Sequence, residues 1–271
     1  DYEPWLAESW EEAADGMSWT FKLKQGVTFH NGEPFNAETV KAWLEAFKAS
    51  ENAYMTEAVA EVQVVEDHTV TFVMSRPEPN LLYNLSSSYM SVIEPKSFAA
   101  LGDNYGVTEV YGTGPFKGTE YAPKQHVILD KNAEYWGGNP HLDRIILQMV
   151  PDSNTFMVQL QTGEIDLGGS GGSIGTTQVD EALKIEGLNV YEHPTMAWNH
   201  LDIKFIAHLR RPKARQALDF APPSQQIIEQ LLLGRATPAI ADQAPGTWAY
   251  NPNIQPRPFD LAQAEALLTE A

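Results

Sequence analysis

Hydrophobic and polar residues in the first part of the chain follow a strand-like pattern around one helical segment. Residues 19–24 alternate apolar and polar side chains, which is the period of a half-buried strand. In residues 37–48 the apolar side chains instead recur at helical spacing, and Asn36 stands in the N-cap position. Two apolar runs within 62–74 flank a short polar turn, which predicts a hairpin. This region therefore predicts a strand meander with one amphipathic helix.

Farther along the chain, predicted helices and strands alternate. Helices are predicted at 81–85, 96–101, 153–160, 178–184, 212–220, 225–233 and 260–271. Strands are predicted at 92–93, 127–129, 145–150, 165–167 and 188–191. Such alternation is typical of a mixed or partly parallel sheet covered by helices. Near the start of the chain, acidic residues predict a solvated helix face at Glu8, Glu11, Glu12 and Asp15.

Composition and charge narrow the class of protein. The 271 residues are 43% hydrophobic, which is typical of a chain that folds into one or two domains. The formal net charge of −18 disfavours a nucleic-acid partner, because phosphate neutralisation requires clustered Lys and Arg. No run approaches the roughly 18 apolar residues that a membrane helix requires. Since the chain has no cysteine, it has no disulfide and no cysteine-ligated metal site.

One short motif suggests enzyme chemistry. Residues 171–175 match the G-x-S-x-G pattern of a nucleophile elbow, with Ser173 as the nucleophile. Five glycines between 168 and 175 make such a match common by chance, so a serine hydrolase is the weaker alternative. The seven histidines include no pair at i,i+4 spacing, and no phosphate-binding loop motif occurs. We therefore expect no catalytic residue, no metal site and no cofactor.

Several short motifs occur in a distinctive order. They are PWLAESW at 4–10, WTFKL at 19–23, GVTFHNGEPFNAE at 26–38, GTGPF at 112–116, YWG at 135–137, GEID at 163–166, RQAL at 215–218 and FDLAQAEALL at 259–268. In this order and spacing, the chain resembles the family 5 extracellular solute-binding proteins, which are the dipeptide, oligopeptide and nickel receptors of ABC importers. The resemblance implies an α/β fold, mixed α+β, of the periplasmic-binding-protein-like type, in which two lobes close on a solute.

Family members run to roughly twice this length, so the resemblance implies that mainly the first lobe is present. It assigns 1–115 to a smaller subdomain of lobe I, 116–245 to its main mixed-sheet part, and 246–271 to the crossing segment and first helix of an otherwise missing lobe II. It further implies a monomeric receptor that captures a peptide or similar small organic solute. The partners implied are that ligand and the ABC permease subunits. The implied location is periplasmic or extracellular, with lipid anchoring left open.

Aromatic and small polar residues in predicted loops resemble the walls of a recognition cleft, although ordinary packing is the alternative for each. The candidate ligand-binding residues are Tyr54, Ser87, Ser88, Tyr89, Gly169, Ser170, Trp198 and Asn199. Tyr54 is similar in position to an aromatic cleft residue of the nickel receptors. Ser88 stands where those receptors carry an arginine that faces an anionic metal chelate. This difference favours peptides or another organic solute, and a nickel chelate stays the alternative within the family.

Overall fold

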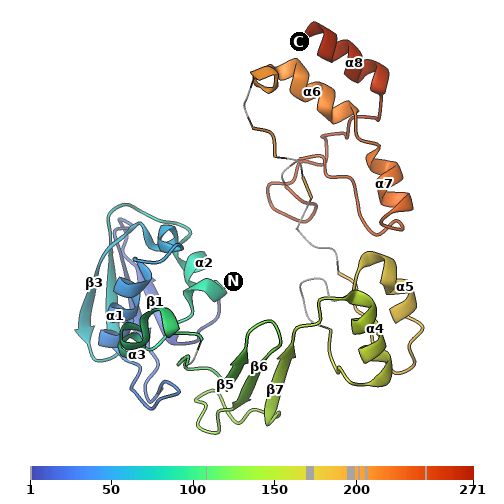
Figure 1. Cartoon of the computed structure of the whole chain (residues 1–271). Coiled ribbons are helices and arrows are strands. Elements are labelled where there is room, and N and C mark those ends of the chain that lie inside the picture. The colour runs from blue at the N-terminus through green and yellow to red at the C-terminus, as the bar shows by residue number, and fades with distance from the viewer. Residues whose placement is uncertain are drawn as a thin grey trace. The chain divides into compact units, whose positions relative to one another are not determined.

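The computed structural model describes residues 2–107, 109–168, 174–193, 199–200, 202–204, 207–241 and 243–271. The chain folds into two compact units, Asp1–Met149 and Val150–Ala271 (Figure 1). Helices and strands are both present, which confirms the expected mixed α/β class.

A four-stranded antiparallel sheet in unit 1 forms the meander that the alternating pattern predicts. Its strands are β1 (Ala7–Glu12), β2 (Ser18–Leu23), β4 (Thr69–Met74) and β3 (Val59–Glu66), paired in that spatial order. The hairpin prediction is confirmed, because β3 and β4 pair directly. The predicted acidic helix near the start of the chain is wrong. That segment forms the edge strand β1, in which Trp10 stands opposite Phe21 of β2, so a non-local pairing overrides the local pattern.

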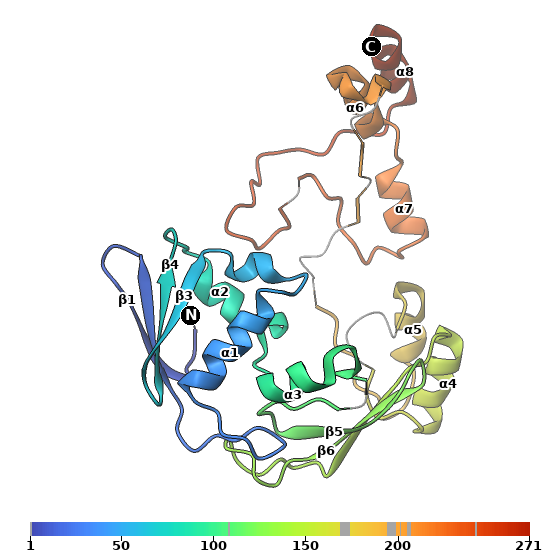
Figure 2. The same ribbon diagram turned by 60° about the vertical axis from the view of Figure 1, so that its left-hand side comes forward.

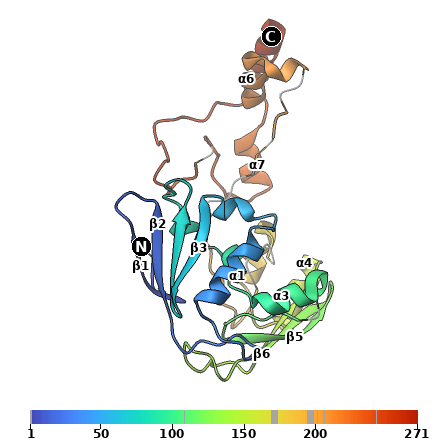
Figure 3. The ribbon, with the colours of Figure 1, turned by 90° about the vertical axis from the view of Figure 1, so that its left-hand side faces the viewer.

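Helix α1 (Ala37–Phe47) covers one face of this sheet, as Figure 3 shows. It begins at the predicted N-cap, where the Asn36 side chain accepts a hydrogen bond from the backbone N–H of Thr39. Trp43 and Leu44 of α1 are buried in the main hydrophobic core together with sheet residues such as Phe72. The helix is thus held both by its cap and by its apolar face.

Five short helices complete this part of unit 1. They are η1 (Ala53–Thr56), α2 (Leu81–Leu85), η2 (Ser88–Met90), α3 (Pro95–Leu101) and η3 (Gly102–Asn104). The helices predicted at 81–85 and 96–101 are confirmed. The strand predicted at 92–93 is wrong, because this segment lies between two helices and pairs with no strand among the described residues.

The rest of unit 1 is a three-stranded antiparallel sheet (Figure 2). Its strands are β5 (Phe116–Ala122), β6 (His126–Lys131) and β7 (Arg144–Gln148), in sequence order. The strands predicted at 127–129 and 145–150 are therefore present. The expected parallel component is not found, because all pairs between the described strands of both sheets are antiparallel.

Unit 2 is helical in its described part. Its elements are α4 (Ser153–Thr162), η4 (Thr176–Gln178), α5 (Val179–Ala182), η5 (Ala207–Arg210), α6 (Pro212–Phe220), α7 (Ser224–Gln230) and α8 (Leu261–Glu270). Helix α6 has the predicted bounds and packs against α8, with Lys213 Nζ 2.7 Å from Glu270 Oε2. Helices α5 and α7 are shorter than predicted. None of the described helices is long and apolar enough to cross a membrane.

The two strands predicted in unit 2 are not formed. Residues 165–167 and 188–191 have irregular backbone, and Leu167 and Tyr191 are largely exposed. A short apolar run becomes a buried strand only where a neighbouring strand supplies backbone partners, and the described part of unit 2 contains none.

Candidate functional site

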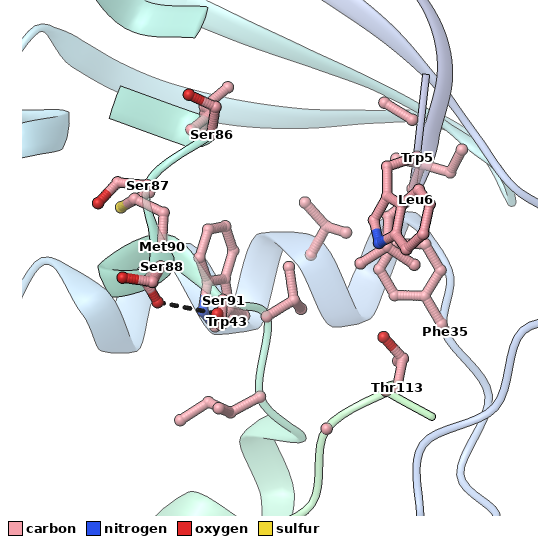
Figure 4. Close-up of a pocket in the computed structure, with 18 of the residues that line it drawn as sticks. Trp5, Leu6, Phe35, Trp43, Ser86, Ser87, Ser88, Met90, Ser91 and Thr113 are labelled. Carbon is pink, nitrogen blue, oxygen red and sulfur yellow. Dashed lines mark hydrogen bonds between the residues drawn. The ribbon is translucent and has the colours of Figure 1, made fainter. Parts of the chain in front are cut away.

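Unit 1 contains a cavity of about 970 Å³ between the four-stranded sheet, α1 and the segment that follows α2. Figure 4 shows Trp5, Leu6 and Phe35 on one side of it and a run of serines on the other. A cavity of this size, with mostly apolar walls and a few polar groups, has the character of a small-molecule pocket.

The serine run, Ser86 to Ser88, joins α2 to η2 and is anchored at both ends. Leu81, at the start of α2, and Met90, at the end of η2, are buried in the main core. The backbone carbonyl of Ser88 accepts a hydrogen bond from Ser91 Oγ at 2.8 Å, drawn as a dashed line in Figure 4. The hydroxyl oxygens of Ser87 and Ser88 are directed away from the apolar side of the cavity. These serines thus present hydroxyl groups on the outer side of the turn.

On the opposite side of the cavity, the lining residue Trp5 packs against Trp136. The rings of Trp5 and Trp136 meet edge to face, with centroids 4.9 Å apart. Trp136 also donates from its Nε1 to the backbone oxygen of Thr113 at 3.0 Å, and Lys24 Nζ lies 5.3 Å from its ring centroid. The ring contacts and the hydrogen bond fix the indole that supports Trp5.

The cavity is nearly free of charge. Its lining includes no Lys, Arg or Asp. The lining does include the carboxyl group of Glu3 and the imidazole of His30. Burial lowers the pKa of His30, Lys117 lowers it further, and the hydrogen bond to the Gly114 carbonyl opposes this shift. The neutral imidazole is therefore the form that this site favours. Such a cavity offers no fixed positive charge to an anionic ligand.

The candidate ligand-binding residues do not all line the cavity. Ser87 and Ser88 line the cavity, whereas Tyr54 and Tyr89 are exposed outside it. Asn199 is exposed in unit 2. The other candidates, Gly169, Ser170 and Trp198, lie outside the described residues. The ligand contacts expected from the sequence remain predictions.

Sequence reasoning missed Tyr83, a third exposed tyrosine near the serine run. A signal was present in α2, where Leu81 and Leu85 are four residues apart on one face and Tyr83 is about 200° around the helix from Leu81. It also missed Trp5 and Thr113 as cavity-lining residues, because their neighbours there are distant in sequence.

The geometry gives no support to the catalytic alternative. The strand required before the nucleophile elbow is absent at 165–167, and Ser173 itself lies outside the described residues. Throughout the described ranges, no cluster of three or more His, Asp or Glu side chains is suited to hold a metal ion.

Comparisons with known proteins give one consistent result. The family model of bacterial extracellular solute-binding proteins, family 5, middle part, matches residues 1–271. Heme-binding protein A of Haemophilus influenzae is 31% identical over 305 residues, which cover 100% of this chain and 54% of that protein. The glutathione-binding protein GsiB of Salmonella typhi is 31% identical over 272 residues, covering 98% of this chain and 52% of that protein.

Solved structures agree with this assignment. The ABC transporter-associated periplasmic binding protein DppA from Helicobacter pylori, in complex with the peptide STSA, superimposes with a TM-score of 0.81 and 26% identity. The match covers 99% of this chain and 57% of that chain. The chain thus spans about half the length of the curated relatives it matches. These relatives are described as binding proteins, and the chain belongs to the bacterial extracellular solute-binding proteins, family 5.

Proposed function

We propose that this chain is part of a solute-binding receptor of an ABC import system, which captures a peptide or a similar small organic solute. The observation that carries the proposal is the family match over residues 1–271. Relatives that bind glutathione and the peptide STSA make a peptide-like ligand the simplest choice. The exposed hydroxyl and phenol groups of unit 1 support the same choice.

In the proposed mechanism, two lobes close on the solute by a hinge motion, and the ligand stabilises the closed form because it contacts both lobes. The division into residues 1–115, 116–245 and 246–271 remains our proposal for how this chain contributes to those lobes. Delivery to membrane permease subunits, a monomeric state, and a periplasmic or extracellular location are parts of the same proposal. The family description as extracellular proteins supports that location.

A nickel chelate is the less favoured ligand within the family. Ser88 is neutral, and the cavity that it lines contains no arginine or lysine to face an anionic chelate. An anion moved into such a site would lose hydration without gaining a charged partner.

Native mass spectrometry of the full-length protein tests the proposal. The protein is measured alone, with a mixed pool of di- to hexapeptides, and with nickel and histidine in a parallel sample. Discrete peptide adducts are expected. A nickel-containing adduct without peptide adducts would contradict the choice of ligand, and the absence of any adduct would contradict the proposed function.

A further inference from the structure

The sequence contains one Asn-Gly pair, Asn31 and Gly32, in the turn that the backbone hydrogen bond from Phe35 to Val27 closes. Both residues of the pair are exposed, and Gly32 has a φ of +87°, which glycine adopts without strain. Because glycine has no side chain, its backbone nitrogen can approach the side-chain amide carbon of the preceding asparagine. This pair is therefore the position in the chain where spontaneous deamidation meets the least steric hindrance.

Deamidation at such a pair is an intramolecular substitution followed by hydrolysis. The Gly32 backbone nitrogen gives its proton to solvent and forms a bond to Asn31 Cγ, and the Cγ–Nδ2 bond breaks as ammonia leaves with a proton from water. Water then opens the resulting succinimide ring at one of its two carbonyl carbons, which yields an aspartate or an isoaspartate. Water is the co-reactant, and nothing is oxidised or reduced. The first step requires a free Gly32 N–H and an Asn31 side chain that can rotate toward it.

Within the turn, both reacting groups are already engaged. The Gly32 backbone N–H donates a hydrogen bond of 2.9 Å to the carbonyl oxygen of Phe29. The side-chain Oδ1 of Asn31 accepts from the backbone N–H of Glu33 at 3.2 Å. Attack on the amide carbon therefore requires that the first of these hydrogen bonds be broken and that the asparagine side chain leave its place.

Two further hydrogen bonds tie the Asn31 amide to the start of α3. Its Nδ2 donates to Glu94 Oε2 at 3.3 Å and to Ser97 Oγ at 3.1 Å. The Glu94 side chain is fully buried, so this acceptor is fixed in place. An ion pair between Lys96 Nζ and Glu33 Oε2, 2.7 Å apart, joins the same turn to the same helix. The side chain that must rotate for the reaction is thus anchored to an element that is distant in sequence.

We propose that Asn31 is a deamidation site that the hydrogen bonds to Glu94 and Ser97 keep unreactive, and that reacts only when the turn separates from α3. A reaction that needs such a local opening proceeds in proportion to the population of the open state. The folded protein therefore deamidates at this position more slowly than the unfolded chain does. This inference does not depend on the ligand of the proposed receptor.

The product of the reaction does not fit the place that the amide leaves. A carboxylate at position 31 has no hydrogen to donate, and it puts a second negative charge beside the buried carboxylate of Glu94. The backbone N–H groups of Lys96 and Ser97 already hold Glu94 in its ionised form. Deamidation therefore releases the turn from α3 and lowers the stability of the fold.

Peptide mapping of the full-length protein by tandem mass spectrometry tests the protection. The tryptic peptide 25–41 contains both Asn31 and Asn36, so fragment ions are used to locate the conversion of amide to acid. During incubation at mildly alkaline pH, Asn31 should deamidate about 10-fold or more slowly in the folded protein than in the urea-unfolded protein. Ser97→Ala should accelerate the reaction in the folded state by about 2- to 10-fold, because the amide loses one hydrogen bond.

The matched control is Ser50→Ala, which removes a hydroxyl that accepts a hydrogen bond from the backbone N–H of Asn52, in another part of unit 1. It should leave the rate at Asn31 unchanged. Equal rates in the folded and unfolded protein would overturn the inference. An unchanged rate in Ser97→Ala, or an equal acceleration in Ser50→Ala, would also overturn it.

Asn31→Asp reproduces one product of the reaction and tests its effect on the fold. Asn31→Ala is the comparison, because it removes the hydrogen bonds to α3 without adding a charge. The urea midpoint of Asn31→Asp should be the lower of the two. Equal midpoints would contradict the repulsion between a carboxylate at position 31 and Glu94.

Discussion

The imidazole of His30 donates a hydrogen bond from Nε2 to the carbonyl oxygen of Gly114, 3.0 Å away. Its other nitrogen, Nδ1, accepts from the backbone N–H of Gly112 at 3.3 Å. One ring therefore satisfies a backbone acceptor and a backbone donor of the segment that precedes β5. Only the neutral tautomer with hydrogen on Nε2 makes both bonds, since a protonated ring has no acceptor.

This arrangement makes the stability of the protein depend on pH. Burial lowers the pKa of His30 below its ordinary value of about 6.5. The unfolded chain therefore takes up a proton at higher pH than the folded chain does. The contribution of His30 should be complete above about pH 6.5 and should decrease as the pH falls from there toward the lower pKa of the folded state.

Urea unfolding from about pH 7.5 to about pH 5 measures this dependence. The free energy of unfolding of the unmodified protein should fall more steeply in that range than that of His30→Gln, which has no titrating ring. His141→Gln, which changes an exposed histidine, should follow the unmodified profile. Parallel profiles for the unmodified protein and His30→Gln would show that the ring makes no such contribution.

Glu94 provides a second test, at the start of α3. Its side chain is fully buried and accepts hydrogen bonds from the backbone N–H groups of Lys96 at 2.9 Å and Ser97 at 2.7 Å. Burial alone would raise the pKa of Glu94, but a hydrogen bond from the Ser97 side chain, these two backbone hydrogen bonds and one from Asn31 outweigh it and lower the pKa. The carboxylate is thus the form that the fold stabilises.

Glu94→Gln should lower the free energy of unfolding at neutral pH by about 1–3 kcal/mol, because one backbone donor loses its charged acceptor. In the unmodified protein the contribution of Glu94 should be present above about pH 4.5 and lost as the pH falls through the lower folded-state pKa. Chemical unfolding at neutral pH gives the difference. Glu57→Gln is the control, since its exposed ion pair with Arg76 is worth less than about 1 kcal/mol. Equal losses in the two variants would contradict the assigned role of Glu94.

The hydrogen bonds that cap α1 lead to a prediction about the stability of the protein. Asn36 and Thr39 each accept a hydrogen bond from the other's backbone N–H. Asn36→Ala should therefore cost about 1 kcal/mol in the free energy of unfolding, measured in urea. Asn52→Ala is the matched comparison, because the Asn52 side chain makes no capping bond to η1, and it should cost little. A cost for Asn52→Ala as large as that for Asn36→Ala would mean that the capping bonds are not the cause.

Local signals were sufficient for the elements that local interactions stabilise. Asn36 and the helical spacing of Val40, Trp43 and Leu44 predict α1 within one residue, because the cap and the apolar face both lie within the segment. The helix predicted for the acidic segment containing Glu8 is wrong for the opposite reason. Its strand conformation depends on pairing with β2, which is a partner outside the segment.

The cavity could not be predicted from local pattern. Its wall combines Trp5, Trp43, Ser88 and Thr113, which only the folded chain brings together. The serine run was recognised as a candidate from its composition, but the sequence did not show that its neighbours Tyr83 and Tyr54 are joined through α2 and η1. The family resemblance identified the class of protein because its motifs extend along the whole chain.

Ligand-dependent stabilisation without turnover is the most direct test of a receptor function. The full-length protein is melted with and without a di- to hexapeptide pool, and the peptides are then recovered and examined by mass spectrometry. A bound peptide at 100 times its Kd should stabilise the protein by about 2.7 kcal/mol, seen as a higher Tm, and should be recovered intact. An unchanged Tm, or recovery of cleaved peptides, would contradict the receptor function.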